Sequence, residues 1–314
     1  MNFFKINEPC DRKDILVVAD QAGIGQHPID ADSFIGLNPK KLGTAYFVDG
    51  GLQEIFSSAN QGFYLLRLSY VKFVDNKRIE QKIFNAFIKT SGVAPFEYQF
   101  SEPFQFFDDI PGGFFDCPKE FEAETFVNQI RRIAELRLSI DLASNMKEGE
   151  LLVLDGSIYP SGYDANEIKA LITLCQERQI NLIGFSKNSL LKSQSGSLIR
   201  EDILEFSRSL DLKRWVCYNV FFEDTLKIST SYAYLHPLSK FAFRIDHITN
   251  PIIPLERLST NSSDGTFPGY PYGLIIVDKL ARVKNEEKNY LYSKHFLSRN
   301  LIEEQNPHEI LDNM

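Results

Sequence analysis

Acidic side chains end two apolar runs of this sequence, where they could hold a cation. Asp49 ends the run 44–48 and precedes two glycines, and Asp155 ends the run 151–154 and precedes Gly156. In an open α/β sheet, ligands bind at the carboxyl ends of the strands. Two carboxylates brought together repel each other and need a cation between them. A single Asp-Gly pair is ordinary turn chemistry, but two at the ends of apolar runs favour a cation site.

Two further acids lie in stretches with helical spacing. Glu135 has apolar neighbours and stands at the edge of the apolar face. The spacing alone favours the alternative that Glu135 is a solvated glutamate paired with Arg131 or Arg132. Asp278 interrupts an apolar stripe, where an acid is costly unless it is paired or coordinates a metal. The spacing leaves both interpretations of Asp278 open.

The elements that must position these acids change type along the chain. Four segments with strand patterns are joined by short turns and predict an antiparallel meander: 44–48, 52–59, 63–74 and 79–89. The apolar spacing then becomes helical from about residue 118 to 146. A strand at 150–155, a helix at 164–178 with Asp164 as its N-cap, and a strand at 181–185 predict parallel pairing through a right-handed crossover.

This order predicts an α/β fold, namely a ribonuclease-H-like mixed sheet flanked by helices. Added elements are expected beyond residue 186: a helix at 201–210, aromatic strands at 215–222 and 241–248, and a final helical section from about residue 271. Residues 1–40 are predicted to be an irregular or helical lead-in. Because no linker divides the chain, we expect one domain over 1–314, with its core at 41–285 and a helix and tail at 286–314.

Composition narrows the classes of function. The 314 residues are 43% hydrophobic and 24% charged, which is typical of a soluble globular protein. The formal net charge of −8 gives no support to broad, non-specific nucleic-acid binding. The four cysteines lack metal-ligand spacing, and we expect a reducing, cytoplasmic setting. No signal peptide and no run long enough to span a bilayer are evident, so no membrane association is expected.

Six segments, in order and at specific spacing, resemble the NurA nuclease family. The resemblance covers roughly residues 40–285 and rests on 45–51 (AYFVDGG), the helix around Glu135, 151–157 (LLVLDGS), 183–188 (IGFSKN), 243–246 (FRID) and 269–281 (GYPYGLIIVDKLA). It implies a manganese-dependent DNA nuclease that digests 5′ to 3′ on single and double strands and cuts single strands internally. It further implies homodimers that act with HerA, a hexameric DNA-translocating ATPase, in DNA end resection and double-strand break repair.

The resemblance assigns the family's acids to four positions, which we expect to be both catalytic and metal-binding: Asp49, Glu135, Asp155 and Asp278. The helix motif is loose, so Glu124 and Glu122 remain alternatives to Glu135. Asp278 stands where some members use His, and Gly273 where many have Pro. Carboxylate oxygens suit Mn²⁺ or Mg²⁺, and the site would hold one or two such cations.

Four other residues match polar positions around the site and are expected to bind substrate. Lys187 could meet a phosphate as a point charge, or be a solvated loop lysine. Arg244 could contact the DNA backbone, or form an ion pair with Asp246. Ser186 precedes Lys187 in the same motif. Tyr270 could stack on a base, or pack at the start of the last helix.

Two functions of other classes remain as alternatives. One is a non-catalytic subunit that guides DNA for the ATPase, and the other is a ribonuclease-H-like nuclease that acts on RNA. Retention of all four acids favours an enzyme, because a scaffold has no need to concentrate carboxylates. The remaining acidity makes strong DNA binding by this chain alone unexpected, so a DNA-threading ring would supply the affinity.

Overall fold

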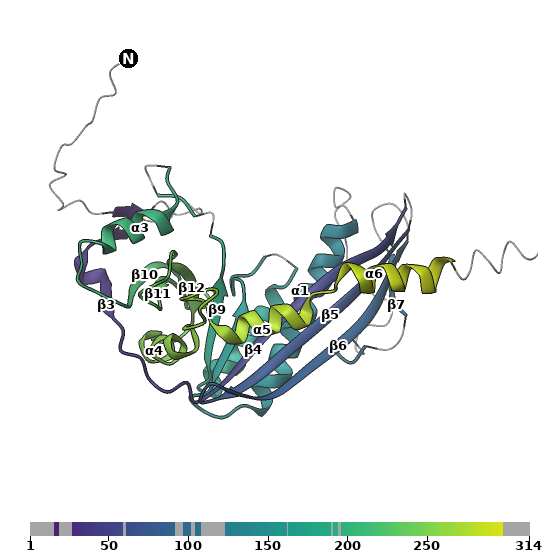
Figure 1. Cartoon of the computed structure of the whole chain (residues 1–314), viewed down its shortest axis with the longest axis horizontal. Coiled ribbons are helices and arrows are strands. Elements are labelled where there is room, and N and C mark those ends of the chain that lie inside the picture. The colour runs from purple at the N-terminus through teal and green to yellow at the C-terminus, as the bar shows by residue number, and fades with distance from the viewer. Residues whose placement is uncertain are drawn as a thin grey trace, which may run out of the picture.

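A ten-stranded mixed sheet runs through the molecule (Figure 1). The structure is a computed structural model, and it describes residues 16–18, 27–58, 61–91, 97–101, 104–107, 123–161, 163–189, 191–193 and 196–297. In sheet order the strands are β3 (Phe34–Gly36), β10 (Trp215–Glu223), β11 (Ile228–Tyr234), β12 (Phe243–His247), β9 (Asn181–Ser186), β8 (Leu151–Asp155), β4 (Thr44–Ser57), β5 (Gln61–Val74), β6 (Lys77–Ser91) and β7 (Glu97–Phe100).

Helices cover both faces of this sheet. They are α1 (Ala123–Asn145), α2 (Ala165–Glu177), α3 (Ile199–Ser207), α4 (Ile252–Asn261), α5 (Tyr272–Ala281) and α6 (Asn285–Tyr292). Smaller elements are β1 (Leu16–Val18) paired with β2 (His27–Ile29), the 3-10 turn η1 (Ala31–Ser33) and the π-helical turn η2 (Ser293–Leu297). Within the described residues, no helix is long and apolar enough to cross a membrane.

The centre of the sheet is parallel, as the sequence predicts. Strand β8 pairs in parallel with both β4 and β9, and α2 makes the crossover between β8 and β9. Residues 151–154 are at most 2% exposed, which explains their uninterrupted apolar sequence. Strands β4, β5 and β6 form the predicted antiparallel meander, and the β5–β6 turn at Asp75 and Asn76 uses two left-handed residues.

Strand β4 differs from the prediction, which placed a break at residues 49–51. Instead β4 continues through Asp49, Gly50 and Gly51, which pair with β5 residues 67–69. The two glycines leave room for neighbours rather than forming a turn. An added Cβ would lie 2.5 Å from Glu135 Oε1 at Gly50, and 2.2 Å from the Ala281 carbonyl oxygen at Gly51. Asp49 therefore lies within a strand and not at its end.

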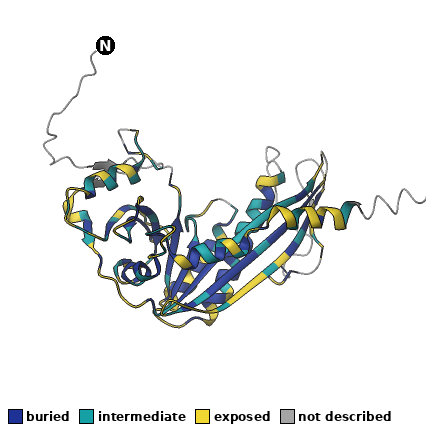
Figure 2. Ribbon diagram, viewed as in Figure 1, coloured by how far each residue is buried: buried dark blue, intermediate teal, exposed yellow. Residues whose placement is uncertain are grey.

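Alternation along the strands divides the core into two layers. Tyr46 and Val48 of β4 pack with α1 and α2, whereas Ala45 and Phe47 pack with α4 and α5. We call these sides the α1 face and the α5 face. Figure 2 shows the buried strands between the two helical layers. Because successive side chains point to opposite faces, the parity of a residue number within a strand decides which face it serves.

Other predictions differ in detail. The described part of residues 1–40, which was predicted to be irregular or helical, contains short strands and the 3-10 turn η1, and β3 pairs with β10 at the sheet edge. Strand β11 was not predicted. Asp164 stands at the N-cap of α2, but its carboxylate accepts hydrogen bonds from Ser161 instead of capping the helix. Strand β7 pairs only with the last part of β6, residues 88–91, and the first half of β6 is exposed.

Candidate active site

Three of the predicted acids meet on the α5 face. Asp49 comes from β4, Asp155 from the end of β8 and Asp278 from α5, and one carboxylate oxygen from each lies within 4.8 Å of the others. Asp49 has the same parity as Phe47, and Asp155 the same as Val153, so both point toward α5. We call Asp49, Asp155 and Asp278 the acid triad.

Two hydrogen-bond donors on the same face hold Asp155. The Lys187 ammonium donates to Asp155 Oδ2 at 2.6 Å and to Asp278 Oδ1 at 3.1 Å. The Tyr270 hydroxyl donates to Asp155 Oδ1 at 3.2 Å. Arg282, one helical turn after Asp278, donates to Asp278 Oδ2 at 3.0 Å. Both oxygens of Asp155 and both oxygens of Asp278 therefore already accept a hydrogen bond.

Asp49 is the most strongly perturbed acid of the triad. Burial raises its pKa most, the carboxylates of Glu135, Asp155 and Asp278 raise it further, and Lys187 lowers it in part, so that the pKa of Asp49 reaches about 8. The backbone N–H of Gly50 donates to Asp49 Oδ1 at 2.8 Å. Such a buried carboxyl ionises readily only when a positive charge is placed beside it.

Glu135 reaches the site from the other face of the sheet. It projects from α1 over Gly50, and its side chain is 6% exposed. Arg131 forms an ion pair with it, and Arg132 Nη1 lies 3.5 Å from its Oε2. The predicted alternative of a pair with these arginines is therefore present, but in a buried setting. The strand β4 separates Glu135 from the acid triad, of which it is not a member.

An open pocket of about 390 Å³ joins the two faces. Among the described strands, β4 pairs with β8 only as far as Val48, and none pairs with that edge beyond this residue. The pocket follows this edge and is lined by residues of both faces: Asp49, Gly50, Gly51, Leu52, Gln53, Glu54, Tyr64, Glu124, Asn128, Arg131, Asp155, Asp278, Ala281, Arg282 and Val283. The alternative acid Glu124 lies here, whereas Glu122 falls outside the described residues.

Arg244 and Ser186 lie on the α1 face, away from the triad. They are register partners on β12 and β9. Arg244 Nε donates to Asp246 Oδ1 at 2.9 Å, and this carboxylate is fully buried. Asp246 also accepts from Ser157, at 2.6 Å, and from Thr230. The ion pair offered as the alternative for Arg244 is thus formed, and its contact with DNA stays a prediction.

Tyr270 is 1% exposed, so its ring has no free face for a base. The ring packs edge-on against Phe185, with centroids 5.2 Å apart, and also contacts Phe243 and Phe267. The ring therefore packs at the start of the last helix, which is the alternative that the sequence offered for this residue. Its hydroxyl has a different task, which is to hold Asp155.

The family model of the NurA domain matches residues 43–283, which is most of the chain. The chain belongs to the NurA family. The match includes every acid of the triad together with Glu135 and Lys187. A search among curated proteins finds no match.

Solved NurA structures share this fold. The NurA nuclease from Sulfolobus solfataricus superposes with a TM-score of 0.51 over 86% of this chain and 87% of that chain, at 13% identity. A NurA structure with manganese gives a TM-score of 0.50 over 84% of this chain and 92% of that chain, at 10% identity. At such identities the likeness concerns the fold, and the predicted ribonuclease-H-like class is confirmed.

The donor set of this NurA chain fits a divalent cation. Three hard oxygen ligands converge from three different elements, and in the part of the chain that the structure describes no cationic side chain forms an ion pair with the buried Asp49. A cation between the three carboxylates would relieve their repulsion. The carboxylates of Asp49, Asp155 and Asp278 could therefore hold such an ion.

Sequence reasoning missed Arg282 and the contact between Ser157 and Asp246. Arg282 follows Asp278 at i+4, so helical charge spacing could have identified it, as it identified the pair of Arg131 with Glu135. Ser157 and Asp246 meet only through the pairing of β9 with β12 and the loop after β8. No local signal in the sequence indicates that contact.

Proposed function

We propose that this NurA protein is a metal-dependent DNA nuclease. One observation carries the proposal: three carboxylates from β4, β8 and α5 converge within 4.8 Å in an open pocket. Buried acids are costly, and a cluster of them is expected where a cation must be held. Membership of the NurA family supports the same activity.

The chain's own residues divide the work of phosphodiester hydrolysis. Asp49, Asp155 and Asp278 would hold the cation, Glu135 would add a carboxylate from the α1 face, and Lys187 would meet the scissile phosphate. A bound divalent cation supplies a nucleophilic water at neutral pH and stabilises charge on the leaving oxygen. Tyr270 would keep Asp155 oriented, as hydrogen bonds to metal ligands commonly do.

The finer features of the proposal follow the family resemblance. We propose Mn²⁺ as the ion, with Mg²⁺ as a substitute, and the match to a NurA structure with manganese supports this choice. We further propose 5′ to 3′ digestion of single- and double-stranded DNA, internal cutting of single strands, and action as a cytoplasmic homodimer with a HerA-type hexameric ATPase in end resection. The net charge of −8 supports a need for such a DNA-holding partner.

Replacement of one triad acid tests the proposal. End-labelled single- and double-stranded DNA and RNA are incubated with purified protein in Mn²⁺, Mg²⁺ or EDTA. We expect cleavage of DNA only with a metal, and its loss in Asp49→Ala with fold and dimer intact. Asp224→Ala, which changes an exposed acid, should cleave like the wild type.

Three outcomes would contradict the proposal. Wild-type cleavage by Asp49→Ala would remove the triad from the mechanism. Selective cleavage of RNA would assign a different substrate. Absence of cleavage with every metal, both with and without the ATPase, would favour a non-catalytic subunit that guides DNA.

A further inference from the structure

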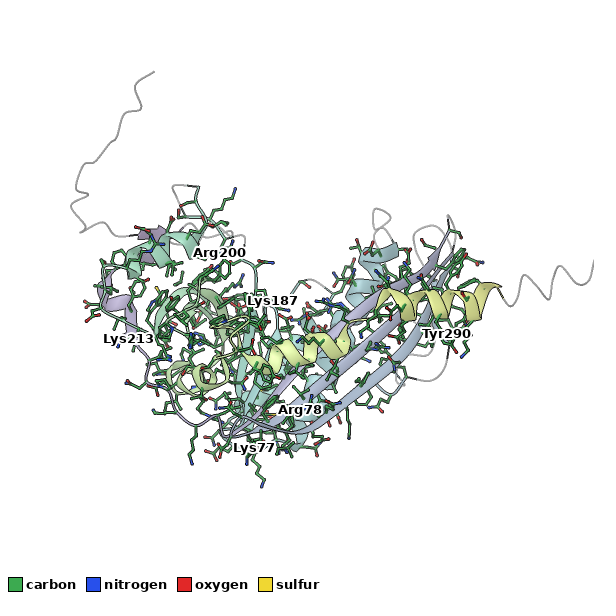
Figure 3. All side chains as sticks on the ribbon, viewed as in Figure 1. Lys77, Arg78, Lys187, Arg200, Lys213 and Tyr290 are labelled. Atoms are coloured by element: carbon green, nitrogen blue, oxygen red, sulfur yellow. The ribbon has the colours of Figure 1, made fainter. Side chains whose placement is uncertain are left out.

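Lys187 lies inside the acid triad rather than on the surface of its loop. It follows the last residue of β9, and its ammonium contacts Asp155 and Asp278 at 2.6 and 3.1 Å. The ammonium also lies 5.4 Å from the centre of the Tyr270 ring. Figure 3 labels Lys187 beside α5, and its side chain is 36% exposed. A positive charge thus sits between two carboxylates that would hold a metal.

This arrangement competes with a divalent cation in two ways. The oxygens of Asp155 and Asp278 that accept from the ammonium are not free to coordinate a metal fully, whereas Tyr270 and Arg282 each donate to one of the remaining oxygens and orient it. An ammonium ion also repels a dication a few ångströms away. Of these three donors, only Lys187 bridges two acids of the triad.

Lys187 can leave the triad at a lower cost than Tyr270. Tyr270 is buried among aromatic rings, so its hydroxyl is fixed. The four-carbon stem of a lysine is flexible, and its ammonium can pass from one anion to another. The Lys187 side chain is partly exposed and its partners Asp155 and Asp278 line the pocket, so a phosphate there would offer the ammonium a new partner.

We propose that Lys187 occupies the cation position of the acid triad until a DNA phosphate draws it away, so that metal and strand bind cooperatively. The identity of the strand rests on the proposed function, whereas the competition with the cation does not. Because coupling between two ligands is reciprocal, DNA would raise metal affinity by the same factor by which metal raises DNA affinity.

Calorimetric titration of the full-length chain with Mn²⁺, without DNA, tests the competition. Lys187→Met keeps the length of the side chain and removes its charge. We expect it to bind Mn²⁺ about tenfold more tightly than the wild type, a gain of about 1.4 kcal/mol. Lys187→Arg retains the charge and should bind Mn²⁺ as weakly as the wild type. A gain of affinity cannot result from misfolding.

Lys192→Met is the matched control, because it removes one exposed lysine from the same loop. It should leave Mn²⁺ affinity at the wild-type value. Equal or weaker binding by Lys187→Met would overturn the proposal, and so would an equal gain in Lys192→Met, which would indicate a general charge effect.

A second titration tests the cooperativity. A phosphorothioate oligodeoxythymidine, which keeps the backbone charge and resists cleavage, should raise Mn²⁺ affinity in the wild type but leave it unchanged in Lys187→Met. The same increase in both proteins would overturn the coupling. If Lys187→Met binds Mn²⁺ more tightly but the wild type never cleaves DNA, only the nuclease function is refuted. If the wild type cleaves DNA but Lys187→Met does not bind Mn²⁺ more tightly, only the role of Lys187 is refuted.

Discussion

At the scale of single residues, the Tyr270 hydroxyl holds one oxygen of Asp155 and its ring belongs to the core. Tyr270→Phe removes the hydroxyl and keeps the ring. Partners of metal ligands typically contribute about 10–100-fold to metal affinity or activity. We therefore expect cleavage or Mn²⁺ affinity to decrease about 10–100-fold in Tyr270→Phe, while the melting temperature barely changes. Full activity in Tyr270→Phe would show that the hydroxyl is not needed to orient Asp155.

The buried side chain of His247 makes the stability of the fold depend on pH. It is 2% exposed, with Nδ1 at 2.7 Å from the Thr249 carbonyl oxygen and Nε2 at 2.8 Å from the Ser231 hydroxyl. Burial lowers the pKa of His247 from 6.5 to about 4. Between these values the unfolded chain binds a proton that the folded protein does not. This contribution to stability is complete above about pH 6.5 and is lost as the pH falls toward 4.

Because of His247, the free energy of unfolding should decrease by about 3 kcal/mol as the pH falls from about 6.5 to about 4. Urea unfolding of the wild type and of His247→Gln, at several pH values between 4 and 7, measures it. The variant should lack this part of the acid sensitivity, so the two curves of unfolding free energy should converge as the pH falls. Parallel curves would mean that His247 takes up its proton over the same pH range in the folded and unfolded states.

At the scale of elements, the position of α5 depends on Gly51. An added Cβ there would lie 2.2 Å from the Ala281 backbone oxygen, at the end of the helix that carries Asp278. Gly51→Ala should therefore displace α5 and cost about 1–3 kcal/mol of stability. Gly265→Ala is the control, because nothing lies within 4 Å of its added Cβ. Equal melting temperatures for the two variants would contradict this packing.

The same elements indicate what could be predicted from sequence. Asp155 was identifiable because its strand is short, fully apolar and ended by Gly156. Asp49 was assigned to the wrong kind of position, because its two glycines give a local turn signal that long-range pairing with β5 overrides. The separation of Glu135 from the triad depends on which face of β4 meets α1. That choice follows from the assembled sheet and not from local spacing.

At the scale of the whole molecule, the sheet extends to a strand from the N-terminal part of the chain. Phe34 of β3 is 8% exposed, with its ring 5.4 Å from that of Phe206 and 5.1 Å from that of Trp215. Phe34→Ala should cost about 3–5 kcal/mol in unfolding free energy. Phe222→Ala, at a position 43% exposed, should change it little. If both variants are equally stable, β3 adds nothing to the sheet.

The far edge of the sheet has a consequence for the protein at high concentration. Among the described residues, β7 pairs only with residues 88–91 of β6, so the edge of 77–86 that faces away from β5 has no neighbouring strand. An uncovered strand edge invites pairing with another chain and then aggregation. This one carries Lys77, Arg78, Glu80 and Lys82, charges of the kind that discourage such pairing. The long hairpin can therefore present a bare edge to solvent without seeding fibres.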